Sequence, residues 1–214
     1  MAKKKKLSRK KRILRLRILV LLVALILIAG IAGLLHLIFS DGYTLSDESD
    51  PVATLTLSNG KRVIVELYKD IAPETVASFI YLANSGFYDG LALKPSGDGS
   101  RLQTGDNALD GTGNAGYSIK GEFALNGFEN ALSHTRGTLS MARLTGYDSA
   151  SSQFFIALAD MPYLDGAYAS FGTVVKGMEH LSRLSGTQGT YIKSIRVDAK
   201  EFSYDFQRLP LVTP

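Results

Sequence analysis

Three serines and two histidines are the residues of this chain that could perform hydrolytic chemistry. Ser149, Ser151 and Ser152 supply hydroxyl groups, and His134 or His180 could act as the base that activates one of them. A hydrolase of the common α/β type places its nucleophile in a G-x-S-x-G turn, and the sequence contains no such turn. We therefore expect no nucleophilic serine here, and we expect both histidines to be structural or exposed.

A glycine-rich segment could in principle bind a dinucleotide, since Gly111–Gly116 has the spacing G-x-G-x-x-G. That use requires a strand before the glycines and a helix after them, whose N-terminus holds the phosphates. Here Tyr117–Ile119 continues with the pattern of a strand. We therefore expect no nucleotide site.

The chain offers few ligands for a metal ion. It has no Cys, and its three histidines, His36, His134 and His180, lie far apart in the sequence. Neither a thiolate site nor a histidine cluster is expected from such a composition. We predict that the protein uses no metal and no cofactor.

The basic residues are concentrated at the N-terminus. Residues 1–17 contain ten of the 24 Lys and Arg residues and none of the 20 acidic residues, so the rest of the chain has a net charge of −6. A nucleic-acid-binding domain needs a basic face on its folded body. We therefore expect no nucleic-acid partner.

Residues 18–39 form an apolar run without Asp, Glu, Lys or Arg. As a helix this run would extend about 33 Å, enough to cross the hydrocarbon core of a bilayer. Basic residues precede it and acidic residues follow, which predicts a cytoplasmic tail (1–17), a single membrane span (18–39) and an extracytoplasmic body in the cell membrane. A cleaved signal peptide is the alternative, although its apolar core is normally about 7–15 residues long.

Beyond the span, the first elements are a linker and a hairpin. Residues 40–51 are polar, acidic and end in Pro51, which is typical of a linker. Val52–Leu57 alternates apolar and polar residues over most of its length, Asn59-Gly60 is a hairpin turn signal, and Arg62–Tyr68 follows as a second strand.

A helix is predicted next. Pro73 suits its first turn, and Gly86 is placed to end it. Its apolar residues recur at helical spacing at Val76, Phe79, Ile80 and Ala83.

The rest of the chain is glycine-rich and has the pattern of many short strands. Strands are expected at 91–93, 101–103, 117–119, 138–142, 153–157, 170–175 and 192–197, with a short helix at 178–184. Residues 201–214 have no clear period and are predicted to be a tail. This pattern favours a mainly β fold, a closed barrel capped by two helices.

Several ordered motifs show that residues 52–200 resemble the cyclophilin family, most closely its bacterial members. They are Gly86-Phe-Tyr-Asp-Gly90, Gly121-Glu-Phe123, Asn126-Gly-Phe-Glu-Asn130, Gly137-Thr-Leu-Ser-Met-Ala-Arg143, Ser151-Ser-Gln-Phe-Phe-Ile156, Tyr163-Leu-Asp-Gly166 and Phe171-Gly172. The resemblance implies an eight-stranded antiparallel barrel with two capping helices. It also implies a peptidyl-prolyl cis/trans isomerase whose partners are proline-containing polypeptides.

The resemblance further implies a substrate groove on one face of the barrel. Phe155 would be the floor of the proline pocket, Leu164 another apolar wall, and Gln103 the residue that binds the substrate backbone. The remaining positions of the groove would be Ala142, Arg143, Gln153, Tyr163 and Tyr168, of which the two tyrosines stand where relatives often have Trp and His.

The sequence departs from the family in the catalytic segment. The family pattern Phe-His-Arg is replaced by Leu93-Lys94-Pro95, so that a proline stands at the position of the catalytic arginine. Proline has no side-chain donor and no backbone N–H. Farther along, Ser100 and Arg101 replace the Phe and Met of the proline pocket.

Two interpretations follow from this departure. In the first, the protein is an isomerase that assists the folding of exported chains, and Arg101, on a neighbouring strand, takes over as hydrogen-bond donor. In the second, the domain is a catalytically weak or inactive cyclophilin-like module that binds peptides at the membrane.

Overall fold

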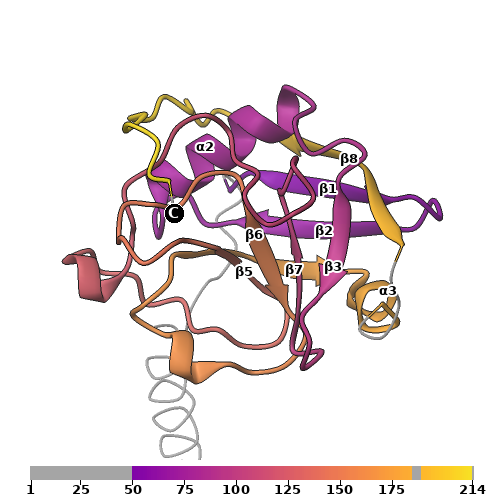
Figure 1. Cartoon of the computed structure of the whole chain (residues 1–214). Helices are drawn as coiled ribbons and strands as arrows, with labels where there is room; N and C mark the ends of the chain where they lie inside the picture. Colours follow the sequence, from indigo (N-terminus) through magenta and orange to yellow (C-terminus); the bar gives the residue numbers. More distant parts are fainter. Residues whose placement is uncertain (1–49, 185–188, 214) are drawn as a thin grey trace, which may run out of the picture. The chain divides into compact units, whose positions relative to one another are not determined.

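The computed structural model of the chain describes residues 50–184 and 189–213, and within these ranges eight strands form a closed antiparallel barrel. The strands are β1 (Val52–Leu57), β2 (Arg62–Leu67), β3 (Ala92–Pro95), β4 (Arg101–Thr104), β5 (Thr138–Met141), β6 (Phe154–Ala157), β7 (Ser170–Lys176) and β8 (Thr190–Asp198). They are hydrogen-bonded in the order β1-β2-β7-β5-β6-β4-β3-β8, and β8 pairs with β1 to close the barrel. The predicted fold class is confirmed for this part of the chain (Figure 1).

The hairpin β1–β2 forms as the sequence predicts. Its side chains alternate between the barrel interior and the outside, and the two strands pair from Val52 with Glu66 to Thr56 with Arg62. Gly60 adopts a φ of +78°, which a glycine accepts without steric cost in a tight turn. The turn therefore fixes the register in which Ala53, Leu55 and Leu57 of β1 and Val63, Val65 and Leu67 of β2 face inward.

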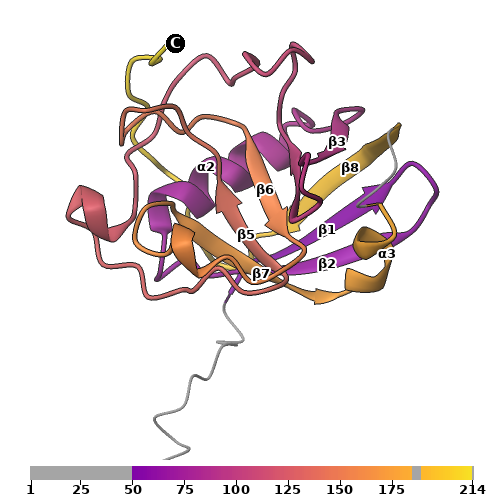
Figure 2. The same ribbon diagram turned by 60° about the horizontal axis from the view of Figure 1, so that its bottom comes forward.

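Two helices pack against the barrel, α2 (Pro73–Asn84) and the short α3 (Met178–Ser182) (Figures 1 and 2). The Phe79 ring of α2 lies 5.3 Å from the rings of Phe154 and Phe171 and 5.5 Å from that of Tyr88. All four rings are buried. Edge-to-face and tilted contacts of this kind add to the hydrophobic stabilisation of the core, so this cluster joins α2 to strands β6 and β7.

The N-terminus of α2 is capped by a residue that is distant in sequence. The N–H groups of Glu74 and Thr75 donate to the two carboxylate oxygens of Glu122, at 2.9 and 2.8 Å. Burial raises the pKa of Glu122, while the hydrogen bonds from Thr75 and Glu74 act in the opposite direction. Because Ala72, which precedes the helix, provides no side-chain cap, Glu122 satisfies two N–H groups that the helix leaves unpaired.

The strand predicted at 117–119 is not formed. Ser118 pairs only with Leu209 and Ile119 only with Ala150, each as an isolated bridge. Since neighbouring residues bond to different segments of the chain, no ladder can continue along them.

The N-terminal predictions lie outside the described residues, namely the basic tail 1–17, the span 18–39 and the linker 40–51 except for its last two residues. Among the residues that the structure does describe, no helix is both long and apolar enough to cross a membrane. The predicted anchor therefore stays a prediction.

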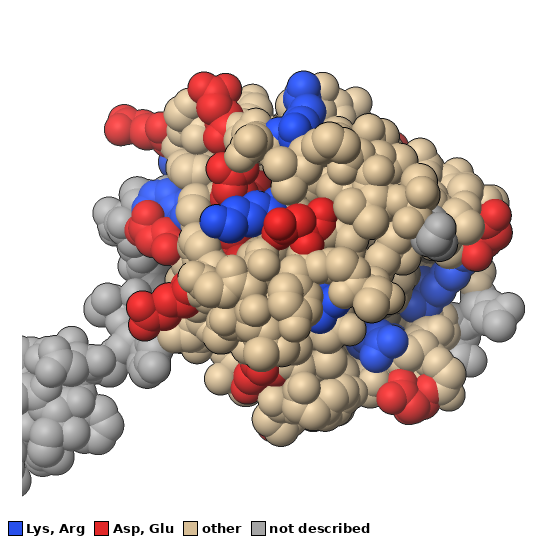
Figure 3. All heavy atoms as spheres, turned by 60° about the vertical axis from the view of Figure 1, so that its left-hand side comes forward, with Lys and Arg blue, Asp and Glu red and all other residues tan. Residues whose placement is uncertain are grey.

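Acidic and basic side chains are both present on the surface of the barrel domain. On the face shown in Figure 3 they lie in small mixed groups around a wide uncharged area. One described pair is Arg196 with Asp89, whose Nη2 and Oδ2 atoms are 2.6 Å apart. Hydrogen bonding to Arg196 lowers the pKa of Asp89.

Candidate functional site

The side chains of β6 alternate between the barrel core and a second apolar cluster. Phe154 and Ile156 belong to the core, whereas Phe155 and Ala157 pack with Met161 in the second cluster. The partly buried residues that pack against this second cluster are Ala142, Leu164 and Tyr168. The alternation follows from the period of two along a strand. The second cluster gathers three of the predicted groove residues around Phe155.

His134 supports the Phe155 ring within the protein. The two rings are stacked with centroids 6.1 Å apart. The ring nitrogens of His134 lie 2.8 Å from Asp165 Oδ1 and 2.9 Å from Ser140 Oγ. Burial lowers the pKa of His134, against the opposing effect of Asp165. The buried ring is held on both sides, which agrees with the structural role expected for this histidine.

Strand β4 directs Arg101 and Gln103 to the same face as Phe155. The antiparallel ladder pairs Gln103 with Phe155 and Arg101 with Ala157, so Arg101 is the diagonal neighbour of Phe155. The guanidinium carbon of Arg101 lies 5.6 Å from the centroid of the Phe155 ring. This is cation–π distance, and it places the guanidinium donors at the edge of the apolar cluster.

A tight turn fixes where β4 begins. The Asp98 carboxylate accepts hydrogen bonds from the Ser96 hydroxyl, from the Ser100 N–H at 3.0 Å and from the Ser100 hydroxyl at 2.8 Å. The Ser96 N–H donates to the Arg101 carbonyl at 2.9 Å. Ser100, at the position of the family's pocket Phe, thus serves the turn that positions Arg101.

Pro95 lies at the end of β3, opposite Leu102 on β4. The strand extends beyond the predicted range 91–93 to include this proline. A proline is tolerated at a strand end because the ladder there requires no donor from it. The structure thus places Pro95 next to β4, without a side-chain group that could donate a hydrogen bond.

A chain of amide groups holds Gln103. Its Nε2 donates to Gln153 Oε1 at 2.9 Å, and Gln153 Nε2 donates to the carbonyls of Gly111 and Gly113 at 2.9 and 2.8 Å. The Gln103 carboxamide is therefore oriented through Gln153 by the loop of residues 106–113. An oriented amide can accept and donate hydrogen bonds to the backbone of an extended peptide.

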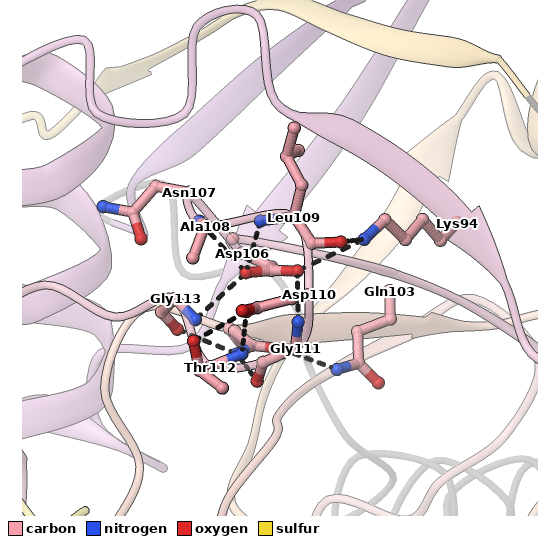
Figure 4. Close-up of polar contacts among 12 residues, drawn as sticks. Lys94, Gln103, Asp106, Asn107, Ala108, Leu109, Asp110, Gly111, Thr112 and Gly113 are labelled. Atoms are coloured by element: carbon pink, nitrogen blue, oxygen red, sulfur yellow. Dashed lines mark hydrogen bonds and ion pairs between the residues drawn. The ribbon is translucent and has the colours of Figure 1, made fainter.

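That loop is organised around the carboxylate of Asp106 (Figure 4). Asp106 Oδ1 accepts from the N–H groups of Ala108, Leu109 and Gly113, and Oδ2 accepts from the Gly111 N–H and from Lys94 Nζ, all between 2.8 and 3.2 Å. Burial alone would raise the pKa of Asp106, but the hydrogen bonds from Gly111, Lys94 and Gly113 outweigh it and lower this pKa.

We expect Asp106→Asn to lower the free energy of unfolding by about 1–3 kcal/mol at neutral pH, because its amide group cannot accept all of these hydrogen bonds. A lowered carboxyl pKa gives stability that is present above the ordinary Asp pKa of about 3.9 and is lost as the pH falls through the folded-state value. The difference from the wild type should therefore shrink in acid. Urea unfolding at neutral pH and at about pH 2.5 measures this difference in the free energy of unfolding. Asp205→Asn, at an exposed position, is the control. An equal difference between Asp106→Asn and the wild type at both pH values would refute the prediction.

Two of the predicted groove residues serve different purposes. Arg143 donates to the Ala167 carbonyl from Nε at 3.1 Å and Nη2 at 3.0 Å, and its guanidinium lies 4.7 Å from the ring centroid of Tyr168. It therefore fixes the edge of the groove through Tyr168. Tyr163 is 67% exposed and is not part of the cluster around Phe155.

The residues considered for hydrolysis are engaged in the fold. The hydroxyls of Ser149, Ser151 and Ser152 donate to the backbone carbonyls of Gly146, Tyr117 and Gly105. The segment Gly111–Gly116 is followed by no helix and instead completes the loop around Asp106. Both motifs thus contribute hydrogen bonds to the fold.

Sequence reasoning missed Met161, a buried member of the apolar cluster around Phe155. Its side chain is buried beside Phe155, and its N–H donates to the His134 carbonyl at 2.7 Å. Met161 reaches this position because the segment that follows β6 packs against His134, which is distant in the sequence. Met161 adds an apolar side chain to the cluster around Phe155, where Ser100 and Arg101 replace the Phe and Met of the family's pocket.

Comparison with known proteins identifies the fold and its family. Residues 52–200 match the sequence model described as "Cyclophilin type peptidyl-prolyl cis-trans isomerase/CLD". Peptidyl-prolyl cis-trans isomerase B of Bacillus subtilis (strain 168) is 41% identical over 142 residues, covering 66% of this chain and 94% of the relative. A peptidyl-prolyl cis-trans isomerase of Helicobacter pylori (strain ATCC 700392 / 26695) is 38% identical over 145 residues, covering 67% of this chain and 84% of the relative.

A solved structure with the same fold is the Cryptosporidium parvum cyclophilin-type peptidyl-prolyl cis-trans isomerase, determined in the presence of the dipeptide Ala-Pro. It superimposes with a TM-score of 0.61 at 26% identity, covering 68% of this chain and 98% of that chain.

Proposed function

The chain belongs to the cyclophilin-type peptidyl-prolyl cis-trans isomerase family, and from this premise we propose that it isomerises X–Pro bonds with Arg101 in place of the family's arginine. The family assignment makes the protein a peptidyl-prolyl cis-trans isomerase. The proposal concerns how its site works with Pro95 at the arginine position, and which polypeptides it serves.

The reaction requires neither a nucleophile nor a metal. Rotation about the peptide bond has a barrier of about 18–20 kcal/mol because resonance is lost in the twisted state. A catalyst must therefore bind the twisted amide more tightly than either planar form. In that twisted state the prolyl nitrogen gains a lone pair, and a hydrogen-bond donor directed at this nitrogen stabilises it.

The observation that carries the proposal is the position of Arg101 over the Phe155 ring, 5.6 Å from its centroid. If the substrate proline packs on Phe155, the guanidinium lies beside the prolyl bond. A guanidinium offers five N–H donors in a fixed plane, so one can be directed at the prolyl nitrogen while the ring contact keeps the side chain in place.

Gln103 and the apolar cluster complete the site in this proposal. Gln103 would bind the peptide backbone next to the proline, since its carboxamide is oriented through Gln153. Phe155, Met161 and Leu164 would enclose the pyrrolidine ring. The Cryptosporidium parvum structure was determined in the presence of the dipeptide Ala-Pro, which supports a proline-containing ligand for this fold.

We further propose that the domain works outside the cytoplasm, tethered by residues 18–39, on exported chains whose folding is limited by slow prolyl steps. The apolar run and the basic residues that precede it support this location. Protease added to intact cells should then digest the domain while an N-terminal tag stays protected. A domain that is protected until the cells are lysed would contradict the proposal, and the mass of the extracted protein would reveal cleavage of the anchor.

Isomerase activity is tested with the full chain and an Ala-Pro peptide, whose uncatalysed isomerisation takes tens to hundreds of seconds. We expect a rate that rises in proportion to protein concentration and falls sharply in Phe155→Ala. Val175→Ala, at an exposed position on β7, is the control and should retain full activity. A folded chain that binds the peptide without accelerating its isomerisation would favour the alternative, a peptide-binding module.

A further inference from the structure

The C-terminal tail forms part of a pocket that continues from the groove. This pocket has a volume of about 390 Å³. Its lining includes the groove residues Gln103, Ala142 and Gln153 together with the tail residues Leu211, Val212 and Thr213. A peptide held by Gln103 therefore passes a surface that the tail helps to build.

The tail is held in place by specific contacts before it reaches the pocket. Leu209 and Ser118 exchange backbone hydrogen bonds of 2.8 and 3.1 Å, and the Val212 N–H donates to Ser118 Oγ at 3.0 Å. The Phe206 ring lies 5.6 Å from that of Tyr117. The guanidinium of Arg208 lies 4.6 Å from the Tyr81 ring centroid on α2. These contacts give residues 211–213 a defined position.

This wall is not supplied by the family domain. The family match ends at residue 200, and the tail begins after it. The pocket therefore has its own shape and chemistry in this chain, determined in part by a segment that the matched domain does not include.

The pocket lining combines polar residues and glycines with an aliphatic part, and two of its three large aliphatic side chains come from the tail. Leu211 and Val212 contribute aliphatic side chains, and Leu144 adds a third. Arg143, the charged side chain at the pocket, already donates to the carbonyls of Ala167 and Leu144. Val212 is 41% exposed, so an apolar ligand side chain could remove its surface from water, which is favourable in proportion to the buried area.

We propose that the tail is a specificity-determining element, in which Leu211 and Val212 select polypeptides with an apolar side chain close to the isomerised proline. The inference rests on the proposed function, because the groove must hold the X–Pro segment for a neighbouring side chain to reach the pocket.

The test uses the full chain and a set of peptides with a central Ala-Pro. Each of the two positions before Ala-Pro and the two after it is occupied in turn by Leu, Ser, Asp or Lys. At one of these positions we expect the wild type to prefer Leu over Ser by about tenfold, in both affinity and kcat/KM. A factor of about ten is the low end of the discrimination that a contact in an apolar pocket provides. A preference for Asp or Lys at all four positions would overturn the proposal, and so would the absence of any preference among the four side chains.

Three variants link this preference to the tail, namely Leu211→Ser, Val212→Ser and a chain that stops after Pro210, which keeps the contacts of Phe206, Arg208 and Leu209. Each should reduce the Leu preference to about twofold or less, because it weakens binding of the Leu peptide more than binding of the Ser peptide. Val175→Ser, at another exposed valine, should keep the full preference.

The affinity measurement separates this inference from the isomerase proposal. A Leu preference in binding that depends on the tail, without isomerisation, would support the tail's role and contradict the proposed catalysis. An unchanged preference in all three variants would overturn the tail's role whatever the activity. Tighter binding of every peptide by the shortened chain would also overturn it, because the tail would then obstruct the pocket.

Discussion

Arg101→Ala is expected to lower kcat/KM for prolyl isomerisation by about 10²–10³-fold, the usual effect of removing one preorganised donor from a transition state. In our account the Arg101 guanidinium, held over the Phe155 ring, is the donor that reaches the prolyl nitrogen. Pro95 cannot replace it, since proline donates no hydrogen bond. The loss should appear mainly in kcat, because the interaction is made with the twisted amide and little with the planar forms.

Three further variants make this prediction specific. Arg101→Lys keeps the charge but not the planar set of donors, and should recover only part of the activity. Arg62→Ala, at an exposed arginine on β2, should have no effect. Adding Pro95→Arg to Arg101→Ala returns an arginine to the family's position and should restore much of the lost rate. Wild-type activity in Arg101→Ala would show that this side chain is not the donor.

Glu122→Ala is expected to lower the free energy of unfolding by about 2–4 kcal/mol. The substitution removes the acceptor of two N–H groups, those of Glu74 and Thr75, at a partly buried helix N-terminus. Each unsatisfied buried donor costs about 1–3 kcal/mol, and the relief of burying a carboxylate offsets part of the sum. Because α2 carries Phe79 into the aromatic core, loss of its cap should affect the whole domain.

Urea unfolding of the full chain, followed by tyrosine fluorescence, measures this effect. Glu129→Ala is the matched control, since Glu129 is exposed, and it should change stability by less than about 0.5 kcal/mol. Glu122→Gln, which keeps one acceptor oxygen, should lie between the two. A stability of Glu122→Ala equal to that of Glu129→Ala would show that α2 does not depend on this cap.

Local patterns in the sequence predicted most of the barrel. The hairpin β1–β2 followed from alternation and its Asn-Gly turn, and α2 followed from Pro73, Gly86 and an apolar face. The segment 117–119 was predicted as a strand because its composition suits one, but its hydrogen bonds go to two unrelated segments. The cap by Glu122 could not be predicted, because 47 residues separate it from Thr75.

The site could also be predicted only in part, because some of its contacts join segments that are far apart in the sequence. The family resemblance identified Phe155, Gln103 and Leu164 as groove residues, and adjacent strands suggested Arg101. The contribution of Met161 depends on a loop that returns to His134, and that of Leu211 depends on a tail that returns to Ser118. Neither long-range contact leaves a local pattern in the sequence.

The most direct test of the central claim is the cis–trans exchange rate of an Ala-Pro peptide that saturates the full chain, measured by NMR for the wild type and for Arg101→Ala. Saturation separates catalysis from binding. We predict rapid exchange on the wild type and, on a folded Arg101→Ala chain with the peptide bound, exchange slower by about 10²-fold or more. Equal exchange rates on the two proteins would contradict the account, as would a wild type that binds the peptide and leaves its exchange at the uncatalysed rate.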